Sequence, residues 1–506
     1  MSRVARSSVV FTTGAAILAL EILASRYMLP VFGTSIFVWG AILSITLISL
    51  AVGYQWGGAL GDQLPKPHLR LVRHILISAG WIAALPLWGT LFLRLGLSTG
   101  ALLGPIVVTA VLFAFPLTLL ATTVPLAFGS ALQEGEPGPG KTLGSLFAIS
   151  TAGSVLGALV TAYIAVPFIG SNRAFLLIAA LLFVIVAPFV FRGTGIKAAI
   201  LVASGLVASK LIPPTARGVP EHKAGVHHLY RADTRYAQVD VLEDERDGSR
   251  VLLLDGASQN WVAGRNWSES QFDYIPALQY HVARFRPPPG RALVLGLGAG
   301  TLVRDLGRRG YDVEAVEIDP LVHEVARTYF SFPSEAATLH FSDARAFLER
   351  AVEAGKTFDV IIMDVTGGGH HPEHIYKRDA YLLIERLLAH DGVMGANMVV
   401  FTHAPLDRAA RYSAATLASV FPVVEAVDLQ PDAGETDNLS QLLLFGAFLK
   451  PRAPFDEDRG QRLLPIEKDL RPLTDDWNPL PLWSIRANAR WHRNMREWLG
   501  EASYLP

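Results

Sequence analysis

Long apolar runs fill the first two hundred residues, and they constrain the fold of this chain more than any other feature. Seven runs, separated by short polar stretches, lie at about 8–29, 36–60, 72–95, 101–131, 143–168, 172–191 and 196–213. A helix needs about 20 apolar residues to cross a bilayer. The pattern therefore predicts a transmembrane bundle of six helices, or seven if the short last run also spans. Buried helices of a soluble protein do not explain so many consecutive long runs.

Two features of these runs predict local detail. The fourth run carries Pro105, Pro116 and Pro125, so we expect it to be kinked or broken. Small residues recur at 57–62 ("GGALGD") and at Gly153 and Gly157, a spacing that favours close packing of helices.

Two ionisable residues, Glu21 and Arg26, stand inside the first apolar run, in "LEILASRYMLP". Ionisable groups within a span are costly, so they pair with one another or line a site. We predict that Glu21 and Arg26 form a polar pair within the membrane. Its role is either to fix helix packing or to contribute to a functional pocket.

The basic residues between the runs set the expected orientation. If every run spans, these basic residues all fall on one side of the membrane, which the positive-inside rule makes cytoplasmic. They are Arg3, Arg6, Lys66, Arg70, Arg73, Lys141, Arg192 and Lys197. Six spans then leave the C-terminal half in the cytoplasm, whereas seven place it outside. The nucleoside site predicted below requires the cytoplasm, so we expect the seventh run to lie in the interface or the fourth to re-enter.

The composition changes sharply near Pro213. The chain as a whole is only 18% charged and has a mean hydropathy of +0.33, but charged residues become dense after this point. We predict three domains: a helical domain at 1–213, a linker and small β domain at 214–285, and an α/β domain at 286–506. The formal net charge of −1 gives no reason to expect a nucleic-acid partner. The absence of cysteine excludes disulfides, thiolate metal sites and a cysteine nucleophile.

From Arg291 the sequence alternates between strands and helices. "RALVLGL" and "FDVIIMD" predict strands, and "ARAFLERAVEAG" predicts a helix. A further helix is predicted over 379–392, where "DAYLLIERLLAHDG" ends at glycine, and "VMGANMVV" then predicts a strand. This alternation indicates a Rossmann-like, doubly wound and largely parallel sheet. Ligands of such sheets bind at the carboxyl ends of the strands.

Glycines and acids stand at those carboxyl ends. Gly296, Gly298 and Gly300 follow the first strand, where glycine lets a ligand approach the backbone. Glu317 lies 21 residues beyond Gly296 and can accept hydrogen bonds from both hydroxyls of a ribose. The last glycine of the dinucleotide fingerprint is missing, which favours an adenosyl-sulfonium ligand over NAD.

Two further acids end the next strands. Asp343 ends the third strand, where it can bond an adenine amine, and Asp364 ends the fourth. The alternative is a sheet with solvated acids along its rim. A glycine turn together with acids on three consecutive strands argues for a nucleoside site instead.

Several segments, in this order, resemble the spermidine synthase (polyamine aminopropyltransferase) family: "LLLDGASQ", "FDYIPALQYH", "VLGLGAGTL", "VEAVEIDP", "FSDARAFL" and "FDVIIMDVT". "LEILASRYMLPVFGTSIFVWG" and "LTDDWNPL" look like patterns of its membrane-fused bacterial members, so the resemblance covers nearly the whole chain. It implies a small β domain followed by a methyltransferase-type Rossmann-like domain. The implied reaction is transfer of an aminopropyl group from decarboxylated S-adenosylmethionine, a co-substrate, to an amine such as putrescine.

The resemblance also implies roles for residues and a place in the cell. By position it assigns nucleoside contacts to Gln259, Gly296, Gly298, Gly300, Glu317 and Asp343, the catalytic base to Asp364, and the substrate site to Tyr236 and Tyr274. It further implies a homo-oligomeric, multi-pass protein of the bacterial inner membrane. Its catalytic domain would face the cytoplasm.

Some family positions differ in this chain. Ala299 stands where the family has an aspartate in the glycine turn, and Gly367 replaces the second acid of a D-x-x-D-P loop. Ile275 and Pro276 replace a His-Glu pair, and Ala237 replaces the glutamine of a Tyr-Gln pair. The missing acids are those expected to hold ammonium groups. The differences therefore leave nucleoside binding supported and remove support for putrescine as the acceptor.

Two other functions stay open at this point. The same fold could transfer a methyl group from S-adenosylmethionine. Alternatively, the apolar half could be a polyamine or small-molecule transporter that the nucleoside domain regulates. A fused bundle also permits an amine acceptor that is delivered by the membrane.

Histidines follow the fourth strand of the α/β domain. His370, His371 and His374 with Glu373 could bind a metal. Substrate contact or solvent exposure fits a loop over the active site better, so we predict no metal.

Overall fold

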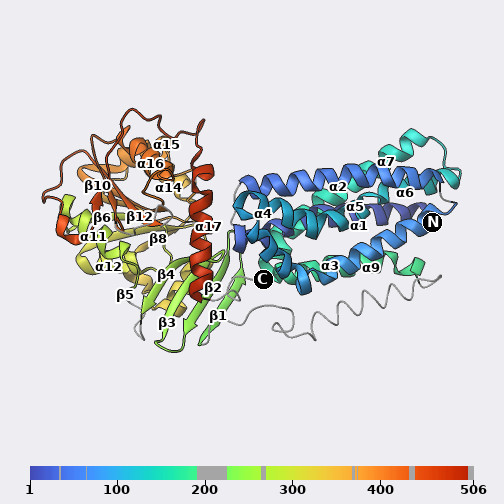
Figure 1. The fold of residues 1–506 in the computed structure, drawn as a ribbon, viewed down its shortest axis with the longest axis horizontal. Helices are drawn as coiled ribbons and strands as arrows, with labels where there is room; N and C mark the ends of the chain where they lie inside the picture. Colours follow the sequence, from blue (N-terminus) through green and yellow to red (C-terminus); the bar gives the residue numbers. More distant parts are fainter. Residues whose placement is uncertain are drawn as a thin grey trace. The chain divides into compact units, whose positions relative to one another are not determined.

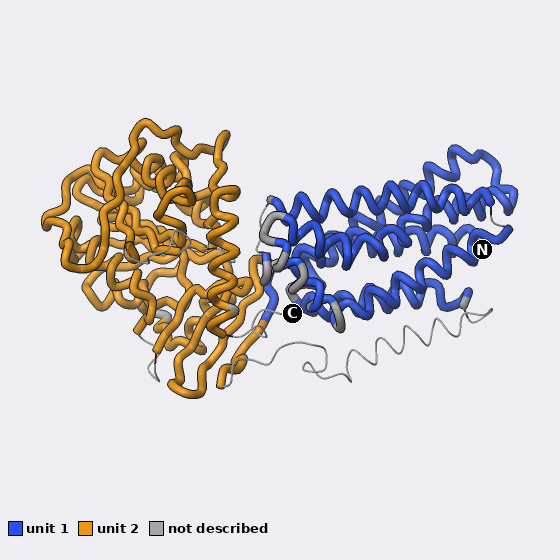
Figure 2. The backbone as a smooth tube through the Cα atoms, viewed as in Figure 1, with its two compact units in different colours: residues 1–221, 232–235, 500–506 blue, residues 222–231, 236–499 orange. Residues whose placement is uncertain are grey.

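The computed structural model describes residues 1–32, 36–63, 65–190, 225–263, 269–366, 371–372, 374–431 and 439–499. The predicted seventh run at 196–213 and the start of the linker lie outside these residues. Two compact units make up the chain (Figure 2): Met1–Glu221 with Ala232–Arg235 and Gly500–Pro506, and His222–Arg231 with Tyr236–Leu499. The division into domains at residues 213 and 285 stays a prediction.

Helices dominate the described residues of the first unit between positions 1 and 190 (Figure 1). They are α1 (Arg3–Phe32), α2 (Ile36–Gln63), α3 (Pro67–Ser98), α4 (Gly100–Thr109), α5 (Phe115–Ala121), α6 (Thr123–Gln133), α7 (Pro139–Val160), α8 (Val166–Ile169) and α9 (Ser171–Val190). Short π-helical turns at Ala110–Ala114 and Thr161–Ala165 connect α4 to α5 and α7 to α8. Apolar side chains from these helices share one hydrophobic core.

Six helical stretches in the described residues are long and apolar enough to cross a membrane by length and composition. They are Arg3–Met28, Phe37–Gln63, Pro67–Pro86, Leu103–Gln133, Pro139–Ala165 and Ser171–Phe189. These stretches correspond to the first six predicted runs. That these stretches cross a membrane stays a prediction.

The fourth of these stretches is irregular, as its prolines predict. Pro116 has no N–H to donate to the carbonyl of Leu112, and the π-helical turn Ala110–Ala114 lies directly before it. The indole Nε1 of Trp81, on α3, donates to that carbonyl oxygen at 2.8 Å. The helix is interrupted again between Ala121 and Thr123. The predicted break in the fourth run is therefore confirmed.

The predicted close packing of small residues is also confirmed. A Cβ atom at Gly153 would overlap the carbonyl oxygen of Phe11, and one at Gly157 would overlap that of Ala15. A Cβ atom at Gly57 would lie 2.8 Å from Cα of Thr122. Glycine at these positions lets α7 approach α1, and α2 approach the junction of α5 and α6, to backbone contact.

The second unit begins with a small antiparallel sheet. Its strands, in order, are β1 (Val226–Asp233), β2 (Gln238–Asp244), β3 (Ser249–Leu254), β4 (Ala257–Ala263) and β5 (Glu269–Ser270). Val239, Val241, Leu252 and Val262 from this sheet pack in one cluster with Val322 and Val325.

An eight-stranded sheet forms the centre of the second unit, in the order β13-β11-β12-β10-β9-β6-β7-β8. The strands are β6 (Gly290–Leu295), β7 (Tyr311–Glu317), β8 (Thr338–Phe341), β9 (Phe358–Met363), β10 (Leu388–Val400), β11 (Val423–Asp428), β12 (Ser440–Ala447) and β13 (Arg462–Leu463). Strands β8, β7, β6, β9 and β10 are parallel, and β12 is antiparallel to β10 and β11. The strand order reverses between β6 and β9, the place where such sheets bind ligands.

Helices cover both faces of this sheet (Figure 1): α11 (Tyr274–Phe285), α12 (Thr301–Arg309), α13 (Pro320–Phe330), α14 (Ala344–Glu353), α15 (Arg378–Leu387), α16 (Arg408–Ala418) and α17 (Leu480–Leu499). Side chains alternate along β6. Leu293 and Leu295 join one hydrophobic cluster with α14 and α15, and Ala292 and Val294 join another with α11 and α12. Continuous apolar strands are expected when both faces of a parallel sheet are buried.

One predicted helix is shorter than expected. The helix predicted over 379–392 ends at Leu387, and the next residues begin β10, where Leu388 pairs with Phe358 of β9. Pairing with a neighbouring strand, which a local pattern cannot reveal, overrides the helical periodicity here.

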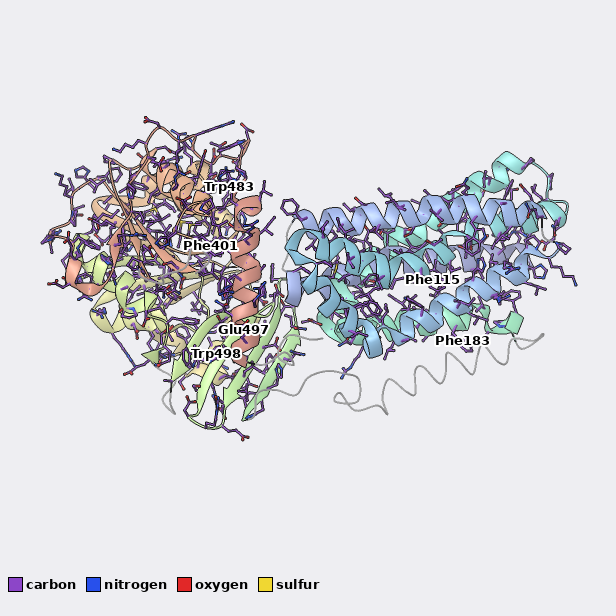
Figure 3. All side chains as sticks on the ribbon, in the orientation of Figure 1. Phe115, Phe183, Phe401, Trp483, Glu497 and Trp498 are labelled. Atoms are coloured by element: carbon purple, nitrogen blue, oxygen red, sulfur yellow. The ribbon has the colours of Figure 1, made fainter. Side chains whose placement is uncertain are left out.

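The last helix, α17, carries tryptophans near both ends (Figure 3). Trp483 packs against Tyr412 on α16 with ring centroids 4.5 Å apart, and Trp498 packs against Trp261 of the small sheet at 4.6 Å. This helix therefore joins the two sheets of the second unit.

Candidate active site

The glycine turn follows β6 and leads into α12. Gly296, Gly298 and Gly300 have φ angles of 98°, 54° and 78°, in the left-handed region that favours glycine. A Cβ atom at Gly296 would overlap the carbonyl oxygen of Asp364, and one at Gly300 would overlap the ring of Phe332. The turn therefore needs glycine both for its backbone angles and for its close approach to the end of β9.

A residue from the small sheet braces this turn. Asn260, on β4, accepts a hydrogen bond from the backbone N–H of Ala299 at 2.7 Å and donates to Thr301 Oγ1 at 2.9 Å. Its side chain is buried. The sequence reasoning missed Asn260; the only available signal was a polar residue within a strand next to Gln259.

Glu317 ends β7 beside the turn. Its two carboxylate oxygens accept backbone hydrogen bonds from Leu297 at 3.1 Å and from Asp319 at 3.0 Å. Burial raises the pKa of Glu317 to about 7, although these backbone hydrogen bonds oppose the shift. The carboxyl group therefore changes charge near neutral pH, at the position predicted to bind the ribose.

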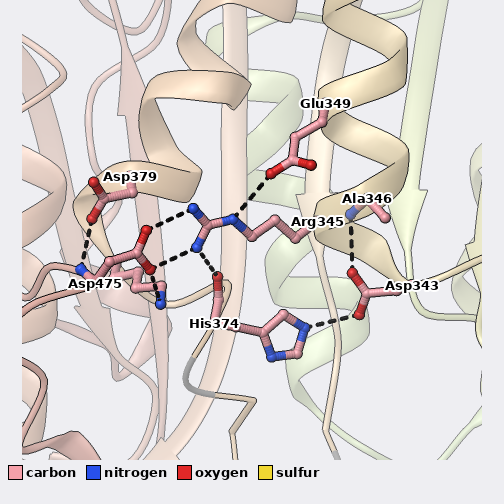
Figure 4. Close-up of polar contacts among 8 residues, drawn as sticks. Asp343, Arg345, Ala346, Glu349, His374, Asp379 and Asp475 are labelled. Carbon is pink, nitrogen blue, oxygen red and sulfur yellow. Dashed lines mark hydrogen bonds and ion pairs between the residues drawn. The ribbon is translucent and has the colours of Figure 1, made fainter.

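Asp343 follows β8 and caps α14. Its Oδ1 accepts from the backbone N–H of Ala346 at 3.0 Å, the usual role of an aspartate at a helix N-terminus. Its Oδ2 lies 2.9 Å from Nε2 of His374 (Figure 4). Both carboxylate oxygens thus have a partner within the chain.

Asp364 follows β9, and its backbone N–H donates to the carbonyl of Leu295 at 2.9 Å. Its Oδ2 accepts a hydrogen bond from the hydroxyl of Tyr274 at 2.8 Å, and its Oδ1 accepts one from Nδ2 of Asn397 at 3.2 Å. The structure therefore brings Asp364, Tyr274 and the glycine turn together. Tyr274 lies on α11, Asn397 lies on β10, and Asp364 follows β9, so three elements meet at this carboxylate.

Burial raises the pKa of the Asp364 carboxyl, while the hydrogen bonds from Tyr274 and Asn397 act in the opposite direction. Burial and then the charge of Asp364 raise the pKa of Tyr274 well above its usual range. Tyr274 therefore stays protonated at neutral pH and donates to the carboxylate. The result is an oriented carboxylate with increased proton affinity.

Asn397 is the second residue that sequence reasoning missed. It is buried in β10. Its backbone carbonyl oxygen accepts a hydrogen bond from the hydroxyl of Tyr376 at 3.0 Å, and the same hydroxyl lies 3.3 Å from the backbone carbonyl oxygen of Val365. A single amide side chain within the apolar strand "VMGANMVV" was the signal that could have identified it.

Gln259 and Tyr236 have different surroundings. Gln259, on β4, accepts a hydrogen bond from the hydroxyl of Thr366 just beyond Asp364, and donates to the carbonyl of Ala257 at 3.1 Å. Tyr236 is 47% exposed, and the Asp364 carboxylate accepts hydrogen bonds from Tyr274 and Asn397. The structure thus places Gln259 at the end of β9 and leaves the role of Tyr236 as a prediction.

The predicted pair in the first apolar run does not form. Both Glu21 and Arg26 lie on α1, and no ion pair joins them within the described part of the chain. Their positions differ by five, whereas neighbours on a helix face are three or four positions apart. Arg26 instead donates to the carbonyl of Arg235 at 2.6 Å. Glu21 is buried.

The histidines after β9 point to different partners. The ring of His371 is buried, and its Nε2 accepts from the backbone N–H of Val399 at 3.0 Å. His374 contacts Asp343, whereas His370 and Glu373 lie outside the described residues. The residues that the structure describes contain no group of three potential metal ligands.

Comparisons with known proteins identify relatives of this part of the chain. Residues 274–425, from α11 to β11, match the family model described as "Spermine/spermidine synthase domain". A polyamine aminopropyltransferase of Vibrio vulnificus is 33% identical over 210 residues, which cover 40% of this chain and 69% of that protein. An N-terminal histidine N-methyltransferase of Emericella nidulans is 31% identical over 188 residues, one third (33%) of each protein.

Among solved structures, a probable spermidine synthase from Corynebacterium glutamicum has 22% sequence identity and a TM-score of 0.36, with 45% of this chain and 81% of that chain covered. The sequence relationship to the Vibrio vulnificus protein extends over more than two thirds of that relative. The chain therefore belongs to the polyamine aminopropyltransferase (spermidine synthase) family of enzymes.

Proposed function

We propose that this chain is a membrane-bound enzyme that transfers the aminopropyl group of decarboxylated S-adenosylmethionine to an amine. The observation that carries the proposal is the Asp364 carboxylate, held by Tyr274 and Asn397 beside the glycine turn. Membership of the family supports the class of reaction. The donor, the acceptor and the membrane location are what the proposal adds.

The residues around the turn fit the nucleoside part of this donor. Glycines keep side chains away from the turn, and Glu317 offers carboxylate oxygens to the ribose hydroxyls. Asp343 would accept from the adenine amino group, and Gln259 would contact the nucleoside near Thr366. When bound, the donor supplies a sulfonium whose aminopropyl carbon is open to attack by a nucleophile.

Asp364 would bind the ammonium group of the acceptor and take up one of its protons. An aliphatic amine has a pKa of about 10.4, so it arrives charged and must lose a proton to become a nucleophile. The raised pKa of Asp364 brings the base closer to the amine in proton affinity. Tyr274 and Asn397 fix the carboxylate while leaving each oxygen a further lone pair for the amine.

The transfer balances without a further reactant. The lone pair of the neutral amine forms the new N–C bond, the C–S bond breaks, and its electron pair stays on sulfur as neutral methylthioadenosine. The proton lost by the amine goes to Asp364 and then to solvent. Because the leaving group is neutral, in-line positioning is the main contribution required of the site.

Methyl transfer from S-adenosylmethionine is the second candidate. Ala299 stands at the position where the resemblance places an aspartate. The turn therefore has no carboxylate at that position to bind the amino group of the aminopropyl arm. The match to an N-terminal histidine N-methyltransferase favours the same alternative. Asp364 could receive the proton of the acceptor in either reaction.

We also propose that the helical unit anchors the enzyme in the bacterial inner membrane, with the catalytic half in the cytoplasm. Six helical stretches of sufficient length and apolarity in the described residues support an anchor. An even number of spans returns the chain to the side of Arg3 and Arg6, which the positive-inside rule makes cytoplasmic. The acceptor would be a small amine, free or delivered by the membrane, and the enzyme would act as a homo-oligomer.

The test is to incubate the purified full-length protein with each donor and a set of amines, and to identify the products by mass spectrometry. Release of methylthioadenosine would support aminopropyl transfer, and release of adenosylhomocysteine would support methylation. Asp364→Asn should abolish either product, whereas Asp312→Asn, an exposed acid on β7, should not. Absence of both products, with flux of amine across protein-containing vesicles, would refute the enzyme proposal and favour transport.

A further inference from the structure

An acidic residue far along the chain lies at the centre of an ion-pair cluster beside the predicted adenine site (Figure 4). Asp475, in "LTDDWNPL", accepts two parallel hydrogen bonds from the guanidinium of Arg345, at 2.8 Å and 2.7 Å. The ammonium of Lys377 pairs with the same carboxylate. The backbone N–H of Asp475 donates to Asp379 at 2.9 Å. One carboxylate thus connects α14 to the residues at the start of α15.

The cluster continues from Arg345 to Asp343. Arg345 also donates to the carbonyl oxygen of His374 at 3.3 Å, and the His374 ring lies 2.9 Å from Oδ2 of Asp343. The other oxygen of Asp343 accepts from the N–H of Ala346 at 3.0 Å. The orientation of Asp343 is therefore fixed on one side by the helix cap and on the other by His374. Arg345 and Asp475 in turn hold the backbone of His374.

The segment that carries Asp475 is itself anchored in the core. Leu473 is fully buried, and its backbone N–H donates to Thr416 Oγ1 at 2.9 Å. Its carbonyl accepts from the N–H of Arg378 at 2.8 Å. Asp475 therefore extends from a fixed support, so the cluster can transmit position to His374.

The geometry of the cluster sets it apart from ordinary surface ion pairs. An isolated exposed pair contributes little, but bidentate arginine–carboxylate pairs and networks contribute more. The Lys377 side chain is nearly buried, whereas the side chain of Asp475 is 46% exposed. Hydrogen bonds from Arg345 and Lys377 hold the pKa of Asp475 well below its usual range, so it stays ionised at any neutral assay pH.

We propose that Asp475 is a positioning residue for the donor nucleoside, acting through Arg345 and His374 on the carboxylate of Asp343. This inference rests on the proposed nucleoside site. A neutral residue at 475 would release Arg345 and with it the carbonyl of His374. Asp343 would lose its fixed orientation toward an adenine amino group. The expected defect lies in donor binding and leaves the chemistry at Asp364 unchanged.

Titration calorimetry of the detergent-solubilised full chain with methylthioadenosine tests this inference. Asp475→Asn should weaken binding about fivefold, the order expected for loss of a good ion pair. Asp476→Asn is the matched control, because Asp476 is the adjacent acid, is exposed and lies outside the cluster. Kinetics should show a raised KM for the donor with kcat and the KM for the amine unchanged. A merely structural role would lower kcat as well.

Two further measurements keep the inference falsifiable if Asp475→Asn folds poorly. Arg345→Lys keeps the charge but loses the bidentate geometry, and it should also weaken binding. Raising the salt concentration should weaken binding to the wild type more than to Asp475→Asn, because salt screens an ion pair whose carboxylate is partly exposed. Equal affinity of Asp475→Asn and Asp476→Asn would overturn the inference. Failure of the wild type to bind the nucleoside would instead refute the proposed function.

Discussion

Replacement of Glu317 by glutamine tests the nucleoside site through its dependence on pH. Burial raises the pKa of Glu317 to about 7 in the free protein, and only the ionised carboxylate can accept from both ribose hydroxyls. Because the pKa of an acid is raised, the binding-competent form is lost below pH 7 and present above it. The nucleoside should therefore bind more tightly as the pH rises through 7.

The magnitude follows from the ionised fraction. With a pKa of about 7, this fraction is about one tenth at pH 6 and about nine tenths at pH 8, so the apparent Kd should fall about tenfold over this range. Binding at pH 6 should also release about one proton per nucleoside, and binding at pH 8 almost none. Glu317→Gln should show neither effect and should bind at least about tenfold more weakly at pH 8, because hydrogen bonds to a charged acceptor are lost.

Titration calorimetry with methylthioadenosine, in buffers of different ionisation enthalpy, measures both the affinity and the proton release. Glu324→Gln is a suitable control, since Glu324 is an exposed acid on α13 and should leave the pH dependence intact. A wild-type affinity that changes less than about twofold between pH 6 and 8, without proton release, would refute the assignment of Glu317 to the ribose.

The hydrogen bond of Tyr274 and the close approach of Gly157 to α1 can each be tested by substitution. Tyr274→Phe removes a hydrogen bond that lowers the pKa of Asp364, so the acid limb of the kcat profile should move to higher pH and kcat should fall about tenfold; an unchanged limb in initial-rate assays would contradict this. In the helical unit, Gly157→Ala should destabilise the protein by about 1–3 kcal/mol, because the new Cβ overlaps the carbonyl of Ala15. Gly144→Ala, on the same helix with nothing within 4 Å, should be neutral or slightly stabilising in the same thermal unfolding assay; equal losses would count against the packing argument.

Local pattern was sufficient for most of the architecture. The six long apolar stretches, the break at Pro116 and the strand–helix alternation after Arg291 were all expected from sequence. Each depends on residues that are close in sequence, such as a run of about 20 apolar residues or a proline without an N–H. The helix predicted over 379–392 was too long because pairing of Leu388 with Phe358 is a contact between distant segments.

In the candidate site, too, some features could be predicted from the sequence and others could not. The glycine turn and the acids Glu317, Asp343 and Asp364 could be predicted, because parallel strands bring their carboxyl ends to one edge of the sheet. The supporting residues could not. Asn397 gave only a weak signal, and the pair expected between Glu21 and Arg26 does not form, because their spacing places them on different sides of α1.

The amino-acid order alone determined which segments are apolar enough to be spans or buried strands, and where glycine and carboxylates end those strands. Only the tertiary structure decided how the carboxylates are held and charged. Tyr274 reaches Asp364 across 90 residues of sequence, and Arg345 reaches Asp475 across 130. The physical reason is that periodicity is a property of neighbouring residues. Burial, and hence the pKa of Glu317, depends on which distant elements pack around a group.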